Sequence, residues 1–259
     1  MTNEHVNPET PASRVAIVTG GASGIGLAIA HRLASDGNAV AVFDRNADGA
    51  ADAAASIEAL GGVALGLGVD VTDRAGIERC VAEVGDRLGR PTILVNNAGL
   101  PWTERFLSVD VQDWERVLDV NLTGTFHCCQ VVIPGMIEEG WGRVVNISSS
   151  SAHSGQPFMA PYVAAKSAVI GLTKSLALEF GPKGITVNTI PPGFVDTPML
   201  RDSEAKGLLG GDIEHHASST PVRRAGRPED IAAMCSFLCR DEAGYVTGQV
   251  LGVNGGRNT

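Results

Sequence analysis

The stretch RVAIVTGGASGIG, residues 14–26, decides the fold of this chain. Its apolar, β-branched beginning is typical of a buried strand, and it leads through a glycine-rich turn into a segment with helical character. Gly20, Gly24 and Gly26 permit a tight turn and a close approach of the backbone to a ligand. The unpaired N–H groups at the start of the following helix would face an anion there. The stretch therefore predicts a strand, a diphosphate-binding turn and a helix.

Short apolar runs alternate with longer helical segments along the rest of the chain. The apolar runs begin at residues 14, 39, 63, 92, 143, 185 and 249. The helical segments lie near 24–35, 47–60, 73–88, 113–137, 161–180 and 228–240. This alternation, without a repeated motif, predicts an α/β fold: an open, doubly wound parallel sheet of about seven strands with helices on both faces. Ligands bind to such sheets at the carboxyl ends of the strands.

The composition agrees with one α/β domain. The chain has 259 residues, of which 44% are hydrophobic but only 5% aromatic, so we expect a core of Val, Ile, Leu and Ala. A net charge of -9 and the lack of a Lys/Arg stripe argue against a nucleic-acid partner. The five cysteines form no CxxC pair, and His215-His216 lacks a third ligand at metal spacing. We therefore expect buried thiols in a reducing cytoplasm and no metal.

Three observations bear on the organisation of the chain. Residues 1–12 are polar and acidic, so we expect a flexible N-terminal tail before a single domain over 13–259. No run approaches 18 consecutive apolar residues, so we expect no membrane span. Residues 198–226 separate the sixth apolar run from the next helical segment. A long insert beside the strand ends is usually a functional lid, and a loosely packed structural excursion is the alternative.

A carboxylate downstream supports the interpretation of the glycine turn as a dinucleotide-binding site. Its G-x-x-x-G-x-G spacing is one residue off the usual dinucleotide fingerprint, and a turn without a ligand is the alternative. Asp44, eighteen residues after Gly26, ends the second apolar run, where it can accept hydrogen bonds from ribose hydroxyls. It would repel a 2′-phosphate by up to about 4 kcal/mol at 4 Å and an effective dielectric near 20. Ser23 leaves the turn without a basic residue, although Arg45 could turn toward a phosphate. We therefore expect NAD rather than NADP.

Polar residues also follow the third and fourth apolar runs. Asp70, in the pair DV at 70–71, could accept a hydrogen bond from an adenine amino group. In NNAG at 96–99, the asparagine side chains could tie neighbouring strand ends together, and Gly99 would let the chain pass close to a cofactor. Ordinary turn residues are the alternative, and Asn97 looks architectural rather than chemical.

The segment YVAAK, residues 162–166, places a phenol and an ammonium four positions apart. On a helix, such residues share one face, about 5–6 Å apart at Cβ. A tyrosine and a nearby serine can give a ketone a proton and a second hydrogen bond, provided that the pKa of the phenol falls. An ammonium at about 6 Å would favour that fall by about 3 kcal/mol at an effective dielectric of 20. An unremarkable surface pair is the alternative, because YxxxK is common by chance.

Together these motifs resemble the short-chain dehydrogenase/reductase family. The motifs are TGGASGIG at 19–26, NNAG at 96–99, a serine thirteen residues before the tyrosine, YVAAK at 162–166, and PG followed by TPM at 192–199. The resemblance extends from about residue 13 to the C-terminus. It implies a Rossmann-like fold and a nicotinamide-dependent oxidoreductase that interconverts a secondary alcohol and a ketone.

The resemblance also implies roles for individual residues. Ser149 would polarise the carbonyl, Tyr162 would exchange the proton, and Lys166 would hold the nicotinamide ribose. Asn121 would hold a water that links the lysine to solvent, and a helix-kinking asparagine is the alternative. The residues expected to contact the cofactor are Gly20, Ser23, Gly24, Ile25, Gly26, Asp44, Arg45, Asp70, Val71, Asn97, Ala98, Gly99, Tyr162, Lys166, Pro192, Gly193, Val195 and Thr197. Of these, Pro192, Gly193 and Thr197 would position the nicotinamide, Thr197 by bonding its carboxamide.

The substrate and the assembly are less determined. The candidate substrate-lining residues are Trp102, His153, Gln156, Phe158, Met159 and Phe194. Because most of them are apolar, we expect a bulky hydrophobic alcohol, such as a hydroxysteroid or an alicyclic alcohol. A reductase of 3-oxoacyl thioesters on carrier protein or CoA is the alternative, and a non-catalytic NAD-binding scaffold is a remote one. The resemblance also implies a homotetramer, in which the helical segments near 113–137 and 161–180 pair between subunits.

Overall fold

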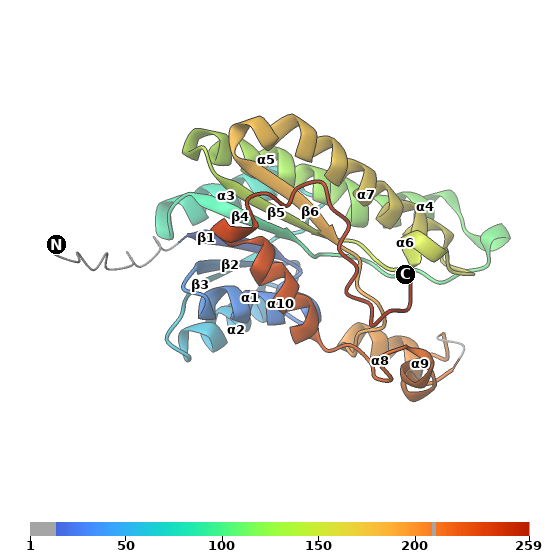
Figure 1. Cartoon of the computed structure of the whole chain (residues 1–259). Coiled ribbons are helices and arrows are strands. Elements are labelled where there is room, and N and C mark those ends of the chain that lie inside the picture. The colour runs from blue at the N-terminus through green and yellow to red at the C-terminus, as the bar shows by residue number, and fades with distance from the viewer. Residues whose placement is uncertain (1–13, 209–210, 259) are drawn as a thin grey trace, which may run out of the picture.

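A single parallel sheet organises the chain, as the computed structural model describes it for residues 14–208 and 211–258. The strand order is β3-β2-β1-β4-β5-β6, with helices on both faces (Figure 1). The strands are β1 (Val15–Thr19), β2 (Ala39–Asp44), β3 (Val63–Gly68), β4 (Pro91–Asn96), β5 (Gly142–Ile147) and β6 (Ile185–Ile190). The tail predicted over 1–12 lies outside the described residues. The predicted α/β fold with a doubly wound parallel sheet is confirmed.

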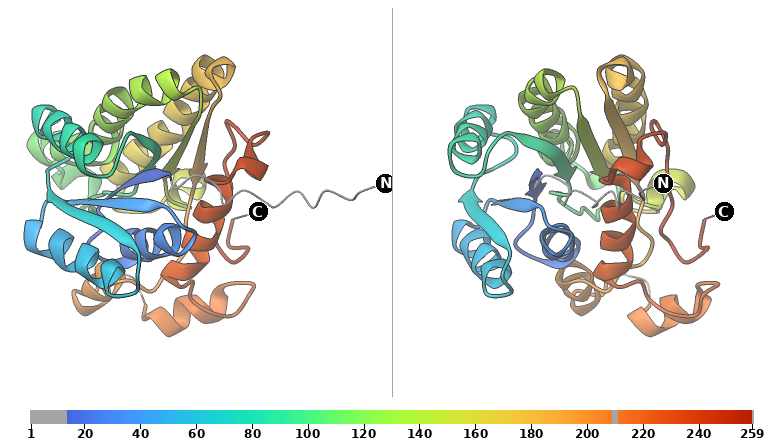
Figure 2. Two further views of the ribbon diagram at one scale, coloured as in Figure 1. Left: turned by 90° about the vertical axis from the view of Figure 1, so that its left-hand side faces the viewer. Right: turned by 60° about the vertical axis from the view of Figure 1, so that its left-hand side comes forward.

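Two layers of helices enclose the sheet (Figure 2). One face carries α1 (Gly24–Ser35), α2 (Ala47–Glu58) and α10 (Pro228–Leu238). The other carries α3 (Arg74–Arg87), α4 (Val111–Leu118), α5 (Gly124–Glu139) and α7 (Ala160–Phe180). Three short helices lie beyond the carboxyl ends of the strands, namely α6 (Ser151–Ser154), α8 (Pro198–Ala205) and α9 (Ile213–Ser219).

The apolar runs form buried strands because successive side chains point to opposite faces of a sheet that is covered on both sides. Ala16 and Val18 of β1 pack into the layer of α1, α2 and α10. Val15 and Ile17 of the same strand pack into the layer of α3, α5 and α7. All five residues of β1 are buried. The carboxyl end of β1 is thereby fixed at the middle of the sheet, where the strand order reverses and a ligand crevice is expected.

The sheet has six strands instead of the predicted seven. Residues 249–253 do run beside β6, since Leu251 N donates to Thr189 O at 2.9 Å and Thr189 N donates to Gln249 O at 3.0 Å. They form isolated bridges rather than a continuous strand. Pro191 and Pro192 follow β6 directly and have no N–H to donate, so the ladder cannot continue.

Helices α8 and α9 lie apart from the two layers, below the sheet edge in Figure 1. Both belong to the insert predicted over 198–226, and neither contains a fully buried residue. The function of this insert as a lid stays a prediction. Among the described helices, none is both long and apolar enough to cross a membrane. Cys80 is half-buried, and the other four cysteines are buried free thiols.

Candidate active site

A cavity of about 1050 Å³ runs along the carboxyl edge of the sheet. It extends from the glycine turn after β1, past the ends of β2, β3 and β4, to the start of α7 and the α8 insert. The predicted site residues that line it are Gly20, Ser23, Gly24, Ile25, Asp44, Arg45, Asp70, Val71, Asn97, Ala98, Gly99, Ser149, Gln156, Met159, Tyr162, Lys166, Pro192, Gly193, Phe194, Val195 and Thr197. Residues far apart in the sequence therefore meet at one cavity.

The turn between β1 and α1 has the shape that a bound diphosphate requires. Gly20 has a φ of +62°, and a Cβ there would lie 2.8 Å from the Cα of Ala98. A Cβ on Gly26 would lie 2.2 Å from the carbonyl oxygen of Gly20, so helix and turn can pack only without a side chain. Ser23 occupies the N-cap of α1, but its side chain makes no capping hydrogen bond. The N–H groups of the first helical turn remain available to an anion, and these residues fit a dinucleotide.

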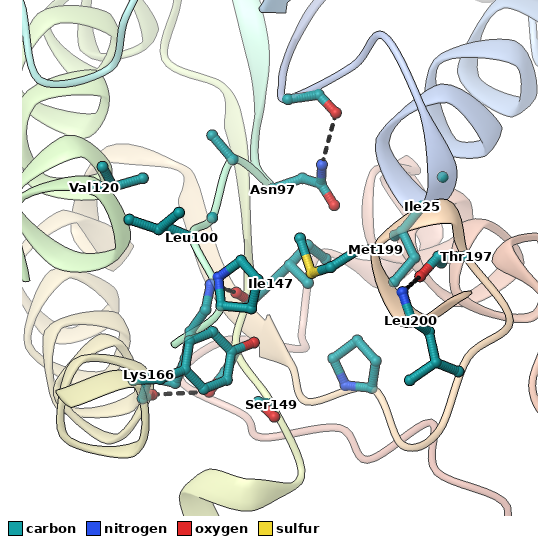
Figure 3. A pocket seen from close by; sticks show the side chains of 18 of the residues that line it. Ile25, Asn97, Leu100, Val120, Ile147, Ser149, Lys166, Thr197, Met199 and Leu200 are labelled. Atoms are coloured by element: carbon teal, nitrogen blue, oxygen red, sulfur yellow. Dashed lines mark hydrogen bonds between the residues drawn. The ribbon is translucent and has the colours of Figure 1, made fainter. Parts of the chain in front are cut away.

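Asn97 fixes the turn against β4, as Figure 3 shows. Its Nδ2 donates to the carbonyl oxygens of Thr19 and Gly20, both at 3.0 Å. Thr19 Oγ1 in turn accepts from the backbone N–H groups of Asn97 and Ala98, also at 3.0 Å. This geometry agrees with the architectural interpretation of Asn97.

Two carboxylates mark the far end of the cavity. Asp44 accepts from the N–H of Ala22 at 3.2 Å and from that of Asn46 at 3.0 Å. Its carboxylate is thereby held beside the glycine turn, where a ribose would lie. Asp70 accepts from the N–H of Thr72 at 2.9 Å and from its hydroxyl at 2.8 Å. Arg45 is exposed and, among the described residues, makes no ion pair.

Lys166 is buried beneath the tyrosine of the same helix face. Its ammonium lies 5.9 Å from the centre of the Tyr162 ring and donates to the carbonyl of Ile147 at 2.9 Å. Burial lowers the pKa of Lys166 to about 8. Figure 3 shows Lys166 and Ser149 on one side of the cavity, opposite Ile25, Thr197 and Leu200.

Tyr162 departs from the expectation for its pKa. Burial raises the pKa of the phenol, and a hydrogen bond with Ser149 opposes this rise. The predicted lowering by Lys166 is wrong for this structure, because burial outweighs the other influences on the phenol and the ammonium bonds to a carbonyl instead. A raised pKa keeps the phenol protonated near neutral pH, which suits a proton donor.

The four serines after β5 have different surroundings. Ser148 is buried and donates to the carbonyl of Lys166 at 2.8 Å, so it anchors α7. Ser149 opposes the rise in the pKa of Tyr162, and its Oγ lies 2.8 Å from that of Ser151. Ser150 and Ser151 also line the cavity. The influence on the phenol therefore distinguishes Ser149 from its neighbours.

Asn121 lies behind this group rather than on the cavity wall. It is fully buried in a π-helical turn, Asp119–Thr123, which joins α4 to α5. Its amide bonds to both backbone groups of Leu100 and donates to the carbonyl of Val117 at 2.9 Å. A Cβ on Gly99 would lie 3.0 Å from Asn121 Oδ1 and 3.4 Å from Lys166 Nζ. Asn121 is thus close to the lysine across Gly99, while its predicted water link stays a prediction.

Thr197 begins the α8 insert beside the glycine turn. Its Oγ1 accepts from the N–H of Leu200 at 3.2 Å and caps α8 (Figure 3). A Cβ on Gly24 would contact the Thr197 side chain at 3.5 Å. The insert therefore starts against the turn that would hold the diphosphate. The predicted bond from Thr197 to a carboxamide stays a prediction.

Three of the predicted substrate residues lie elsewhere. His153 is exposed on α6, and Phe158 is 58% exposed with a φ of 64°. Trp102 does not line the cavity, and its indole N–H is buried with no acceptor among the described residues. Nearness in sequence to the serines or to NNAG did not bring these side chains to the cavity.

Other residues of the cavity wall were not predicted. They include Leu100, Pro101, Thr103, Met199, Leu200, Leu208, His216, Arg257 and Asn258. The TPM motif at 197–199 gives a signal for Met199, because Met199 lies two residues after Thr197, which is expected to contact the cofactor. The C-terminal residues had no such signal, since only the fold brings them to Ser150.

Comparison with known proteins finds relatives over nearly the whole chain. A family model described as enoyl-(acyl carrier protein) reductase matches residues 20–258. The short-chain reductase protein NovJ of Streptomyces niveus is 44% identical over 247 residues, which cover 94% of this chain and 93% of that protein. The 3-oxoacyl-[acyl-carrier-protein] reductase FabG of Thermotoga maritima is 38% identical over 243 residues, which cover 94% of this chain and 97% of that protein.

A solved structure shares the architecture. It is a variant of actinorhodin polyketide ketoreductase with NADPH, 37% identical, with a TM-score of 0.91. The match covers 95% of this chain and 98% of that chain. The similarity includes both the sheet and the elements around the cavity, because so little of either chain lies outside it.

Proposed function

The chain belongs to the short-chain dehydrogenase/reductase family, and we propose that it reduces the 3-oxo group of an acyl thioester to a secondary alcohol. The observation that carries the proposed reaction is that Ser149, Tyr162 and the buried Lys166 meet on the wall of one cavity. Support for the thioester comes from the relative named 3-oxoacyl-[acyl-carrier-protein] reductase and from the polyketide ketoreductase. These relatives support a 3-oxoacyl thioester better than the hydroxysteroid or alicyclic alcohol expected from the sequence.

Each residue of the group has a separate task in this proposal. The nicotinamide cofactor, when bound, supplies the hydride for the carbonyl carbon. The Ser149 hydroxyl donates to the carbonyl oxygen and fixes its position, in the manner of an oxyanion-hole donor. Tyr162 gives its proton to the same oxygen as a general acid. Lys166 stabilises the phenolate that forms, by about 3 kcal/mol at roughly 6 Å and an effective dielectric of 20.

A panel of ketones tests the proposed substrate class. Reduction would be followed at 340 nm with acetoacetyl-CoA, a neutral acetoacetyl thioester, cyclic ketones and oxosteroids. We expect kcat/KM for the thioesters to exceed that for the other ketones by at least about tenfold, a difference of about 1.4 kcal/mol in transition-state binding. Higher kcat/KM for oxosteroids or cyclic ketones would favour a hydrophobic secondary alcohol instead. That second candidate has support from the apolar wall of Leu100, Met159, Phe194 and Met199.

We further propose that NAD(H) is preferred over NADP(H), because Asp44 is held at the ribose end of the cavity. In Asp44→Asn the carboxylate charge is lost, while the shape and one acceptor for the backbone N–H groups remain. Removing a repulsion of up to about 4 kcal/mol should lower the KM for NADPH by tenfold or more and change the KM for NADH little. Steady-state kinetics with both cofactors measures this.

Arg45→Gln serves as the matched variant for the cofactor prediction. Arg45 follows Asp44 and lines the same end of the cavity. If Asp44 governs the choice, Arg45→Gln leaves the ratio of the two KM values near that of the wild type. An unchanged ratio in Asp44→Asn, together with a large change in Arg45→Gln, would contradict the assignment.

A further inference from the structure

The C-terminal residues 254–258 form part of the wall around the reactive group. Arg257 and Asn258 line the same cavity as Ser149 and Tyr162. Figure 1 shows the C-terminus beside α6, in the space between that helix and the pair α8 and α9. This segment therefore reaches the cavity from the side opposite to the glycine turn.

A chain of hydrogen bonds holds this segment in place. Asn258 Nδ2 donates to the carbonyl of Ser150 at 2.7 Å, next to the reactive serine. Asn254 Nδ2 donates to the carbonyl of Asn258 at 3.1 Å, and Asn254 Oδ1 accepts from the N–H of Gly256 at 2.9 Å. An aspartate at position 254 could accept from Gly256 but could not donate to Asn258. The amide of Asn254 thus fixes both ends of the segment that carries Arg257.

The guanidinium of Arg257 lies over an aromatic residue of the cavity. Its Cζ is 5.6 Å from the centre of the Phe194 ring, which also stacks on His216 at 4.6 Å. Phe194 directly follows Gly193, in the loop predicted to position the nicotinamide. Within residues 14–208 and 211–258, Arg257 forms no ion pair. Its charge therefore lies on the cavity wall beside Phe194 and is not paired with a carboxylate there.

The other two arginines of the cavity wall also form no ion pair among the described residues, but each is close in sequence to a carboxylate that lines the same cavity. Arg45 follows Asp44, and Arg116 lies one helical turn before Asp119, and both carboxylates line the cavity. Arg257 is flanked instead by glycine and asparagine. In a chain with a net charge of -9, a cation in such surroundings is the better anion site.

We propose that Arg257 is a specificity-determining residue that binds an anionic group of the substrate, a phosphate or a carboxylate. The inference rests on the proposed function, since a thioester substrate carries its phosphates on the pantetheine arm. Guanidinium binds either group through paired N–H donors. Asn254 and Asn258 act as positioning residues for it.

Binding to a complex that cannot turn over tests the proposal. Enzyme saturated with oxidised cofactor cannot reduce a ketone, so calorimetric titration reports affinity alone. Acetoacetyl-CoA and a neutral acetoacetyl thioester form the phosphate arm of the comparison. 3-Oxoglutarate and its dimethyl ester form the carboxylate arm. If wild-type enzyme binds acetoacetyl-CoA more tightly than the neutral thioester, Arg257 binds a phosphate. If it binds 3-oxoglutarate more tightly than the dimethyl ester, Arg257 binds a carboxylate.

The matched variants are Arg257→Gln and Arg105→Gln, which remove the same charge from two exposed arginines. Arg105 does not line the cavity, and its guanidinium makes no hydrogen bond or ion pair among the described residues. In Arg257→Gln we expect about tenfold weaker binding of the preferred anionic ligand, because a hydrogen bond to a charged group is lost at a solvent-accessible site. Binding of its neutral partner should not change. Arg105→Gln should bind both ligands as the wild type does.

Three results would overturn the proposal. One is a wild type that prefers neither anionic ligand over its neutral partner, and another is equal weakening of both partners in Arg257→Gln. The third is the same loss in Arg105→Gln, which would indicate a general effect of net charge. Turnover of the neutral thioester by wild-type enzyme is measured separately. Its absence would count against the proposed reaction, while the binding comparison would still decide the role of Arg257.

Discussion

Tyr162→Phe should lower kcat for ketone reduction by about 10³-fold or more, near the upper end of what general acid–base catalysis contributes. The change removes only the phenolic oxygen and leaves the aromatic ring on the cavity wall that it shares with Ser149. The neighbouring Lys166 ammonium is directed instead at the carbonyl of Ile147, to which it donates at 2.9 Å. Single-turnover measurements at 340 nm with bound reduced cofactor give the chemical rate directly.

Cofactor binding provides the control for this variant. The glycine turn and Asp44 lie at the other end of the cavity, so titration should give the wild-type affinity within about twofold, or about 0.4 kcal/mol. If Tyr162→Phe retained more than about a tenth of the wild-type rate, general acid catalysis by this residue would be excluded, since that contribution is at least about 10².

The pH dependence of the wild type gives a second readout for Tyr162. Burial lowers the pKa of Lys166 to about 8, so its ammonium is present below that pH and is lost above it. The phenol itself has a raised pKa and stays protonated. For reduction, kcat/KM should therefore be level below about pH 8 and fall above it, as the phenolate loses its cation. The residual activity of Tyr162→Phe should lack this fall.

Much of the fold could be predicted because its periodicities are local. The helical segments expected near 24–35 and 228–240 correspond to α1 and α10, and the apolar run from residue 14 corresponds to β1. The seventh strand could not be excluded from its sequence, since QVLGV has the composition of a strand. A regular strand is absent because the segment pairs with the chain that contains Pro191 and Pro192, and only the folded structure shows which chain is its neighbour.

The site also contains residues that could be predicted from the sequence and residues that could not. Residues at strand ends, such as Asp44 and Asn97, could be placed because parallel strands end at one edge. Trp102 and Phe158 could not, since nearness in sequence does not determine the direction of a side chain. Arg257 enters the cavity only through contacts of the C-terminal segment with Ser150.

The pKa of Tyr162 and the oligomeric state also could not be predicted from local sequence patterns. The charge of Lys166 suggested a lower pKa for its tyrosine, but the extent of burial, which raises that pKa, is a property of the whole fold. The homotetramer stays a prediction. Phe126 of α5 is 42% exposed and Leu178 of α7 is 84% exposed, which leaves apolar surface on the helices expected to pair between subunits.

The four serines after β5 allow the sharpest test of the proposed mechanism. Ser149→Ala should lower kcat for reduction by about 10²–10³, the loss typical of one oxyanion-hole donor. Of the four serines, Ser149 is the one that opposes the rise in the pKa of Tyr162. Ser151 Oγ lies 2.8 Å from Ser149 Oγ, so the Ser151 hydroxyl can supply part of the missing hydrogen bond to the carbonyl oxygen. The double variant Ser149→Ala with Ser151→Ala should therefore have a lower kcat than Ser149→Ala alone.

Two neighbouring variants separate chemistry from structure. Ser148→Ala removes a buried hydrogen bond to the carbonyl of Lys166, so it should reduce the free energy of unfolding by about 1–3 kcal/mol and change kcat less. Ser150→Ala should leave kcat within about threefold, or about 0.7 kcal/mol, because its carbonyl and not its hydroxyl holds Asn258. Chemical denaturation and steady-state kinetics on all three variants distinguish these effects. A loss of kcat in Ser150→Ala equal to that in Ser149→Ala would move the carbonyl-polarising role to Ser150.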